Sequence, residues 1–186
     1  MRSATRLSLL LALVLSMQAG AGNIQSASVD YKAGVYSLSF NVVIDAELDS
    51  VRAIVTDYAR FDQLSEMVIE SALLDTPHAD QERRLLVIRP CILVFCRDLR
   101  MVEDVTVEGH DRIATTVVPD QSDFKSGKTH WQLTGVDRQH TRIEFYGYEE
   151  PGFWIPPLFG PVLVQRRLLK EAMTIITNIE HLSRNG

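Results

Sequence analysis

The C-terminal segment from Pro161 to Ser183 carries the pattern that most constrains the fold. Its apolar residues recur every three or four positions, which predicts a helix with an apolar face covering about half its circumference. The residues on that face are Val164, Leu168, Leu169, Ala172, Met173, Ile175, Ile176, Ile179 and Leu182. Pro161 suits the first position of such a helix. A face this wide is stable only when another layer of the protein covers it.

Short strand-like segments supply that layer. They are rich in β-branched and aromatic residues, and turn residues separate them. The predicted strands cover 35–45, 67–75, 82–94, 100–108, 112–119, 128–136 and 141–150. Pro90 predicts an edge, a bulge or a break. This order predicts an α+β fold in which a curved antiparallel sheet of about seven strands wraps around the C-terminal helix.

A shorter helix is predicted over 46–61. Apolar residues recur at helical spacing from Leu48 to Tyr58, and Asp45 stands where an N-cap is expected. A short helical turn is expected around 61–64.

The connections between strands form two sets. Successive turns of a meander alternate between the two ends of the sheet. The turns 76–80, 108–111 and 137–140 are polar and fall at one end. The turn near Cys96, the loop 119–127 and the segment 149–161 fall at the other end. That end is apolar, which is typical of the mouth of a hydrophobic cavity or of a rim that touches a membrane.

The segment 149–161, EEPGFWIPPLFGP, has four prolines, which exclude a regular helix or strand over most of its length. The alternative to a lid or membrane wedge is that the segment folds inward and seals the core, since large aromatic residues are usually buried. The side chains expected at the cavity mouth are Phe153, Trp154, Ile155, Leu158 and Phe159.

The first 22 residues have the pattern of a secretory signal peptide. Basic residues precede an apolar run from Leu7 to Met17, and an A-x-A arrangement ends at Ala21. The run is shorter than the roughly 20 apolar residues of a membrane span, so we expect cleavage near Ala21 or Gly22 rather than anchoring. We therefore predict a signal peptide over 1–22, one domain over 23–186, and a periplasmic location.

The charge and the cysteines limit the class of protein further. The chain has 19 Lys and Arg residues against 24 Asp and Glu residues, which argues against a nucleic-acid partner. In an exported protein Cys91 and Cys96 can form a disulfide. Along one extended strand they would stand roughly 16 Å apart, so the disulfide requires a turn between them. Two free thiols are the alternative, and no metal site is expected because further ligands are missing nearby.

Two segments of the sequence resemble segments of proteins in the helix-grip superfamily. This superfamily includes START-like domains, the polyketide cyclase/dehydrase and lipid-transport group, and coenzyme Q-binding proteins. The stretch FKSGKTHWQL, 124–133, is similar to the segment before the last strand of that superfamily. The pattern D-A-x-x-x-x-V-x-x-I-x-x-D-Y-x-x-F resembles its first helix and is formed by Asp45, Ala46, Val51, Ile54, Asp57, Tyr58 and Phe61. The resemblance implies a hydrophobic ligand held between the sheet and the long helix. No cofactor is expected, since phosphate-binding and dinucleotide motifs are missing.

Candidate site residues follow from this arrangement. The residues assigned to the ligand cavity or its rim are Phe95, Phe124, Trp131, Phe153, Trp154, Ile155, Leu158, Phe159, Leu168, Ala172 and Ile176. The candidate head-group contacts, for which a solvated surface is the alternative, are Asp123, Lys125, Arg166, Arg167 and Lys170.

These features favour non-catalytic binding or transport of a lipid or of an isoprenoid or quinone-like ligand, with transient membrane contact. One alternative is a cyclase/dehydratase-like enzyme, which needs acid–base groups inside the cavity. Another is an interaction domain whose rim binds a protein. We assign no catalytic residue. His130 is expected to face outward because Trp131 faces inward, and the candidate inward polar residues are Arg84, Thr115, Thr129 and Glu144.

Overall fold

The computed structural model of the chain describes residues 22–76, 81–92 and 95–185. The predicted signal peptide, apart from Gly22, lies outside the described residues. In chain order the elements are β1 (Asn23–Lys32), β2 (Val35–Ile44), α1 (Leu48–Val55), the 3-10 helix η1 (Tyr58–Gln63), β3 (Val68–Leu74), β4 (Glu82–Ile88), β5 (Cys91–Ile92), β6 (Phe95–Cys96), β7 (Leu99–Glu108), β8 (Arg112–Val117), the 3-10 helix η2 (Pro119–Gln121), β9 (Phe124–Gly135), β10 (Thr141–Pro151) and α2 (Gly160–Asn185).

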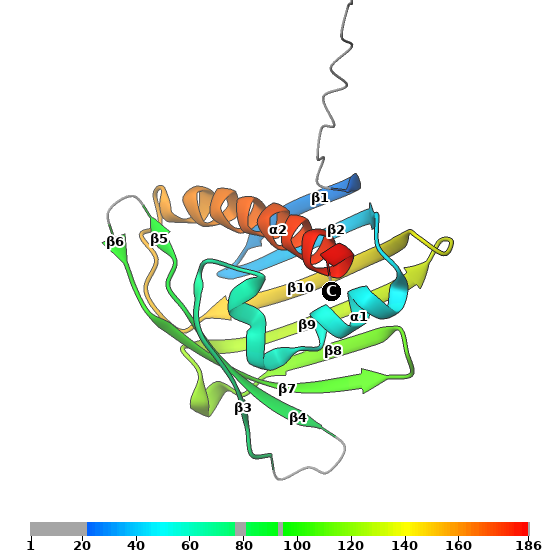
Figure 1. Cartoon of the computed structure of the whole chain (residues 1–186). Helices are drawn as coiled ribbons and strands as arrows, with labels where there is room; N and C mark the ends of the chain where they lie inside the picture. Colours follow the sequence, from blue (N-terminus) through cyan, green and yellow to red (C-terminus); the bar gives the residue numbers. More distant parts are fainter. Residues whose placement is uncertain (1–21, 77–80, 93–94, 186) are drawn as a thin grey trace, which may run out of the picture.

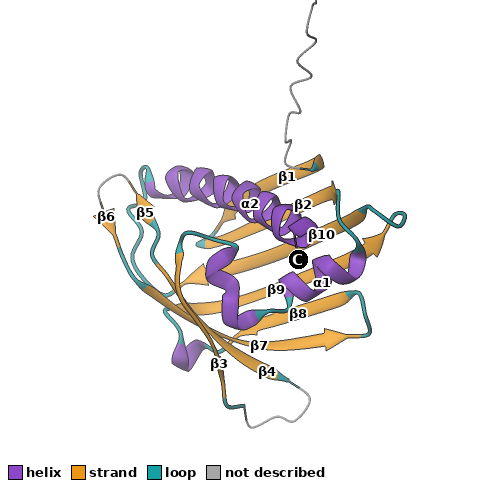
Figure 2. Cartoon of the chain, viewed as in Figure 1, coloured by secondary structure: helices purple, strands orange, loops and turns teal. Residues whose placement is uncertain are grey.

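One antiparallel sheet of eight strands forms the body of the molecule, in the order β1-β2-β10-β9-β8-β7-β4-β3. The sheet is strongly curved, and α2 lies across its concave face together with α1 and η1 (Figures 1 and 2). This α+β arrangement of a curved sheet around a long C-terminal helix confirms the predicted fold class. Among the described residues, no helix has the length and apolar character needed to cross a membrane.

The sheet has one strand more than the sequence predicts. β1 pairs along the free edge of β2, and the two strands are joined by a tight turn with positive φ at Ala33 (52°) and Gly34 (90°). Such a turn matches the twist of a hairpin. Most residues of β1 are exposed, so its sequence lacks the alternation that identifies a half-buried strand.

Two predicted elements end earlier than expected. The strand predicted over 82–94 ends at Ile88, and strand pairing is interrupted at Pro90 before the short β5–β6 hairpin. Proline has no N–H that could join the hydrogen-bond ladder. The helix predicted over 46–61 ends at Val55, where the chain turns and buries Tyr58.

The predicted helix cap at Asp45 is also wrong. Glu47 occupies the N-cap position, without a side-chain cap hydrogen bond. The Asp45 carboxylate instead lies 3.4 Å from Nε2 of His140.

The main core lies between the concave face of the sheet, α1 and the C-terminal half of α2. It joins residues from distant parts of the chain because β2 and β10 lie under the helix. Its buried members are Phe40, Val42, Ile44, Ala46, Val51, Val55, Tyr58, Leu64, Val105, Ile113, Leu133, Ile143, Ala172, Ile176 and Ile179.

Candidate functional site

The long helix packs tightly on the sheet at one end and loosely at the other. In its C-terminal half Ala172, Ile176 and Ile179 are buried in the core. In its N-terminal half the residues of the same face, Val164 and Leu168, are only half-buried. The concave face is therefore best covered at the C-terminal end of α2 and least covered near its start.

An aromatic cluster lies on the concave face in the middle strands. Phe40 stacks on Phe145 with ring centroids 4.9 Å apart, and Trp131 meets Phe145 edge-on at 4.8 Å. Phe40 is buried, but Trp131 and Phe145 are only half-buried. These rings offer apolar and polarisable surface that an apolar ligand can cover.

A polar cluster lies on the same face, toward β4. Arg84 donates to the Glu103 carboxylate from Nη2 at 2.7 Å and from Nε at 2.8 Å. The Thr115 hydroxyl donates to the other Glu103 oxygen at 2.6 Å and lies 2.9 Å from the hydroxyl of Thr129. All four side chains are buried. A buried ion pair is tolerable only when hydrogen bonds satisfy its remaining atoms, and here Thr115 satisfies the second Glu103 oxygen.

Aromatic rings cover the buried guanidinium. The Arg84 carbon Cζ lies 4.6 Å from the ring centroid of Phe61 and 5.4 Å from that of Tyr58. A cation over a ring face is attracted by the ring quadrupole. Burial raises the pKa of Tyr58 to about 12, so its hydroxyl stays protonated. That hydroxyl has no hydrogen-bond partner within the described part of the chain.

Glu149 is the second acidic group on this face. Part of the residue reaches the surface, but its carboxyl is enclosed by protein. Burial, and next the charge of Glu103, raise the pKa of the Glu149 carboxyl to about 8, while Arg84 acts in the opposite direction. At neutral pH the carboxyl is therefore mainly protonated and can donate a hydrogen bond.

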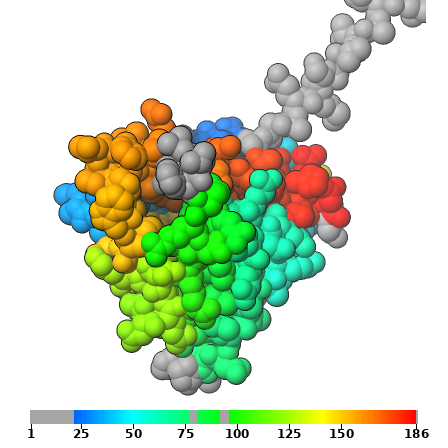
Figure 3. Space-filling model, turned by 90° about the vertical axis from the view of Figure 1, so that its left-hand side faces the viewer, coloured from blue at the N-terminus to red at the C-terminus, as the bar shows by residue number. Residues whose placement is uncertain are grey.

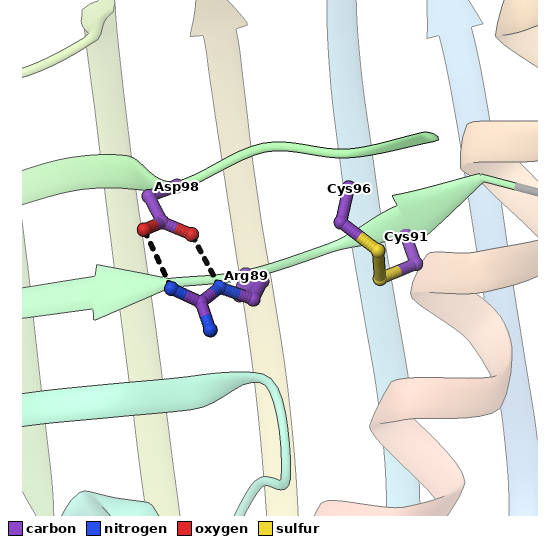
Figure 4. The surroundings of a disulfide bond; sticks show 4 residues. All are labelled: Arg89, Cys91, Cys96 and Asp98. Atoms are coloured by element: carbon purple, nitrogen blue, oxygen red, sulfur yellow. Dashed lines mark hydrogen bonds and ion pairs between the residues drawn. A yellow bond between two sulfur atoms is a disulfide. The ribbon is translucent and has the colours of Figure 1, made fainter. Parts of the chain in front are cut away.

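A disulfide-closed hairpin stands at the end of the sheet near the start of α2. Cys91 and Cys96 face each other across β5 and β6, with Cα atoms 4.1 Å apart, and form a disulfide (Figure 4). At the base of the hairpin Arg89 donates to both oxygens of Asp98, at 2.5 Å and 2.7 Å. Two cross-links thus hold this short hairpin, which pairs outside the main sheet.

The exit segment, residues 152–159, joins β10 to α2 at the same end, where it forms part of the orange surface in Figure 3. Trp154 is 77% exposed, Leu158 is 92% exposed and Phe159 is 55% exposed. Phe153 instead packs edge-on against buried Phe124, at 5.7 Å, with the Arg97 guanidinium over its ring. One aromatic residue anchors the segment while three large apolar side chains project from it.

Comparison with solved structures identifies the architecture. Zhui aromatase/cyclase from Streptomyces sp. R1128 superposes with a TM-score of 0.67 at 8% identity, covering 81% of this chain and 94% of that chain. A START superfamily protein from Mycobacterium smegmatis superposes with a TM-score of 0.63 at 16% identity, covering 80% of this chain and 97% of that chain. A STAR-related lipid transfer protein from Xanthomonas axonopodis superposes with a TM-score of 0.60 at 20% identity, covering 84% of this chain and 98% of that chain. The chain has the helix-grip, START-like fold. No protein-family model matches the sequence, and no match is found among curated proteins.

The helix-grip fold places the predicted cavity residues in three settings. Phe124, Ala172 and Ile176 are buried. Trp131, Phe153, Ile155 and Leu168 are half-buried, and Trp154, Leu158 and Phe159 are exposed. The side chain of Phe95 lies outside the described part of the structure. Apart from Trp131 in the middle of β9, the exposed and half-buried members thus gather near the start of α2, while Ala172 and Ile176 belong to the packed core.

The candidate head-group residues do not form one cluster. The Asp123 carboxylate accepts the backbone N–H of Arg100 at 2.7 Å, so it fastens the loop before β9. Lys125 pairs with Glu150 at 3.2 Å, and Arg167 lies 3.5 Å from Glu171. Arg166 and Lys170 are exposed on the first turns of α2, beside the apolar exit segment.

Four inward polar residues were expected, and the structure places Arg84, Thr115 and Thr129 on the concave face as predicted. Glu144 is wrong, because it is exposed on the opposite face and accepts a hydrogen bond from Asn41 at 3.2 Å. His130 is exposed on that opposite face, as expected.

Neither Glu103 nor Glu149 is among the polar residues that the sequence predicts to face inward. A signal for each was present, because Glu149 continues the alternation of buried Ile143 and Gly147 along β10, and Glu103 is two positions from buried Val105.

Two hollows lie away from this face. One of about 210 Å³ lies between α1, η1 and the end of α2, and its lining includes Asp57, Arg60 and Asn185. Another, of about 380 Å³, is lined mainly by residues whose side chains point away from α2, among them His130 and Tyr146. Within the described residues, no group of three or more His, Cys, Asp or Glu gathers as a metal site would require.

Proposed function

We propose that the protein binds an apolar ligand, of the lipid, isoprenoid or quinone-like class, on the concave face of its sheet beneath α2, and carries it without catalysis. The observation that carries this proposal is the exposed apolar rim. Trp154, Leu158 and Phe159 project at the end where α2 covers the sheet least. Exposed apolar side chains gathered at one site are typical of contact with a ligand, a membrane or a protein partner.

The interior offers such a ligand a suitable surface. A hydrocarbon tail that covers Trp131 and Phe145 leaves water, and each buried methylene contributes about 0.8 kcal/mol. Two of the similar structures are named as an aromatase/cyclase and a lipid transfer protein. Both names are consistent with apolar molecules as ligands of this fold.

The rim also suits a membrane surface. Trp154 and Phe159 supply aromatic side chains that favour the interfacial region of a bilayer. Arg166 and Lys170, exposed on the first turns of α2, supply positive charge that attracts anionic head groups. We propose that the protein is exported, that its signal peptide is removed, and that the rim touches a membrane when the ligand enters or leaves.

One observation favours a second candidate, a cyclase/dehydratase-like enzyme. The Glu149 carboxyl holds a proton near neutral pH, because burial raises its pKa to about 8. A proton donor beside an apolar surface is a requirement for acid–base chemistry on an apolar substrate.

The experiment starts from protein purified from its own periplasm and examined by native mass spectrometry. A co-purified lipid-sized mass supports binding. Transfer of that lipid between phosphatidylethanolamine/phosphatidylglycerol vesicles, unchanged by Glu149→Gln, supports a carrier. Chemical conversion of the co-purified molecule that Glu149→Gln abolishes supports the enzyme. Protein that carries no apolar molecule and takes none from vesicles contradicts both.

A further inference from the structure

A buried carboxylate holds the first described residue of the chain. The backbone N–H of Gly22 donates to Oε2 of Glu180, at 2.7 Å. Glu180 is only 6% exposed. Among the described residues Arg184 is the cation that pairs with Glu180; its Nη1 lies 3.5 Å from the other carboxylate oxygen, and its side chain is 57% exposed. A buried charge is costly unless it is well paired, and one amide N–H with one distant, solvated guanidinium pairs it poorly.

Gly22 is pressed against the end of β2. A Cβ atom at this position would stand 2.8 Å from the carbonyl oxygen of Val43, 2.9 Å from Cγ2 of Ile44 and 3.0 Å from Cγ2 of Val42. These distances leave no room for a side chain, so glycine alone fits here. The close approach fixes the Gly22 nitrogen beside the C-terminal turns of α2.

We propose that the peptide bond between Ala21 and Gly22 is the maturation site and that the Gly22 α-ammonium is the ion-pair partner of Glu180. The inference rests on the expected export and is independent of the ligand. The A-x-A arrangement that ends at Ala21 directs a signal peptidase to this bond. Hydrolysis adds one water across the amide. Ala21 leaves with the carboxylate, and the Gly22 nitrogen takes up protons to become an ammonium.

Cleavage changes the partner that Glu180 receives. The nitrogen carries one N–H before the cut and three, with a full positive charge, afterwards. The Ser183 hydroxyl, three residues further along α2 and therefore on the same face, is buried and has no hydrogen-bond partner in the described part of the chain. It is a second acceptor for the new donors. The mature N-terminus thus ties the edge strand β1 to α2 through charge.

The test uses the exported protein. Intact mass is expected to show a chain that begins at Gly22. The pKa of its α-amine is then measured from the pH dependence of acylation at the N-terminal peptide. An ordinary α-amine has a pKa of about 7.7–8.0, and a carboxylate partner raises it. Near neutral pH the wild-type amine should react about tenfold more slowly than that of Glu180→Gln, which corresponds to about one pKa unit.

Glu171→Gln is the matched control, because Glu171 is an equally buried acid of the same helix with other partners, Ser65 and Arg167. It should leave the reactivity of the amine unchanged. A chain that begins at any other residue overturns the maturation site. Equal reactivity in wild type and Glu180→Gln overturns the ion pair. If Glu180→Gln does not fold, a wild-type α-amine with an ordinary pKa overturns it as well.

Discussion

The Arg84 guanidinium and the Glu103 carboxylate lie 2.7 Å apart, with side chains only 7% and 1% exposed. The two residues face each other across β4 and β7. Together with Thr115, Thr129 and Glu149 they form a polar centre on a concave face whose other side chains are mainly aliphatic and aromatic. Their pairing is what allows either charge to stay in the interior.

We expect Arg84→Met to lower the free energy of unfolding by about 3–5 kcal/mol, because it leaves the Glu103 charge buried without its partner. The double variant Arg84→Met/Glu103→Leu removes both charges and should recover most of that loss. Urea unfolding monitored by tryptophan fluorescence measures both. A double variant less stable than the single one would contradict the assignment of the cost to an unpaired charge.

Glu149 should make the protein less stable as the pH rises. Its pKa is about 4.5 in the unfolded chain and about 8 in the folded protein, so the folded state binds more protons between these two pH values. The contribution of Glu149 to the free energy of unfolding should therefore be largest below about pH 4.5 and decline toward pH 8, by up to about 1.4 kcal/mol per pH unit. Glu149→Gln should remove this decline in urea midpoints. Glu144→Gln, an exposed acid on the same strand, should leave it in place.

The rim should bind membranes without stabilising the fold. Trp154→Ala/Phe159→Ala should change the free energy of unfolding by less than about 0.5 kcal/mol, since both side chains are exposed. The variant should bind anionic vesicles more weakly in a sedimentation assay. Tyr146→Ala removes an aromatic residue that is 50% exposed elsewhere and should bind normally. Vesicle binding that is equal in all three proteins would rule out the membrane contact.

Phe153→Ala should behave differently from the rim variant. Phe153 packs on Phe124 and beneath Arg97, so its truncation should lower the free energy of unfolding by about 1–3 kcal/mol. Chemical denaturation measures the loss. A cost no larger than that of Trp154→Ala/Phe159→Ala would mean that Phe153 does not anchor the exit segment.

Reduction of the Cys91–Cys96 disulfide should loosen the hairpin and little else. The bond closes a loop with a sequence separation of 5, and a loop this short contributes about 2 kcal/mol in the chain-entropy model. Hydrogen exchange should accelerate in β5 and β6 on reduction and stay unchanged in β9 and β10. Acceleration throughout the sheet would show that the hairpin supports the whole fold.

The sequence by itself determined the elements whose burial is periodic. The apolar stripe of α2 and the alternation along β9 both identify the face that packs inward, and the alternation predicts Trp131 inside and His130 outside. The antiparallel meander from β3 to β10 could be predicted because short turns join neighbouring strands, whereas the pairing of β2 with β10 could not. β1 is not predicted from the sequence because most of its residues are exposed, so no clear alternation marks this edge strand.

Only the tertiary structure decided which charges are buried. Asp and Glu are usually exposed, so Glu180 looks like a surface residue in the sequence, and the alternation that puts Glu103 on the inner face does not show which residue pairs with its charge. Each is buried because its partner comes from a distant position, Arg84 for Glu103 and Gly22 for Glu180. The exposure of Trp154 likewise could not be predicted from the sequence, since an aromatic side chain in an irregular segment can point into the core or into solvent. Periodicity reports how one element meets a core, whereas contacts between separate elements depend on how the sheet curves around α2.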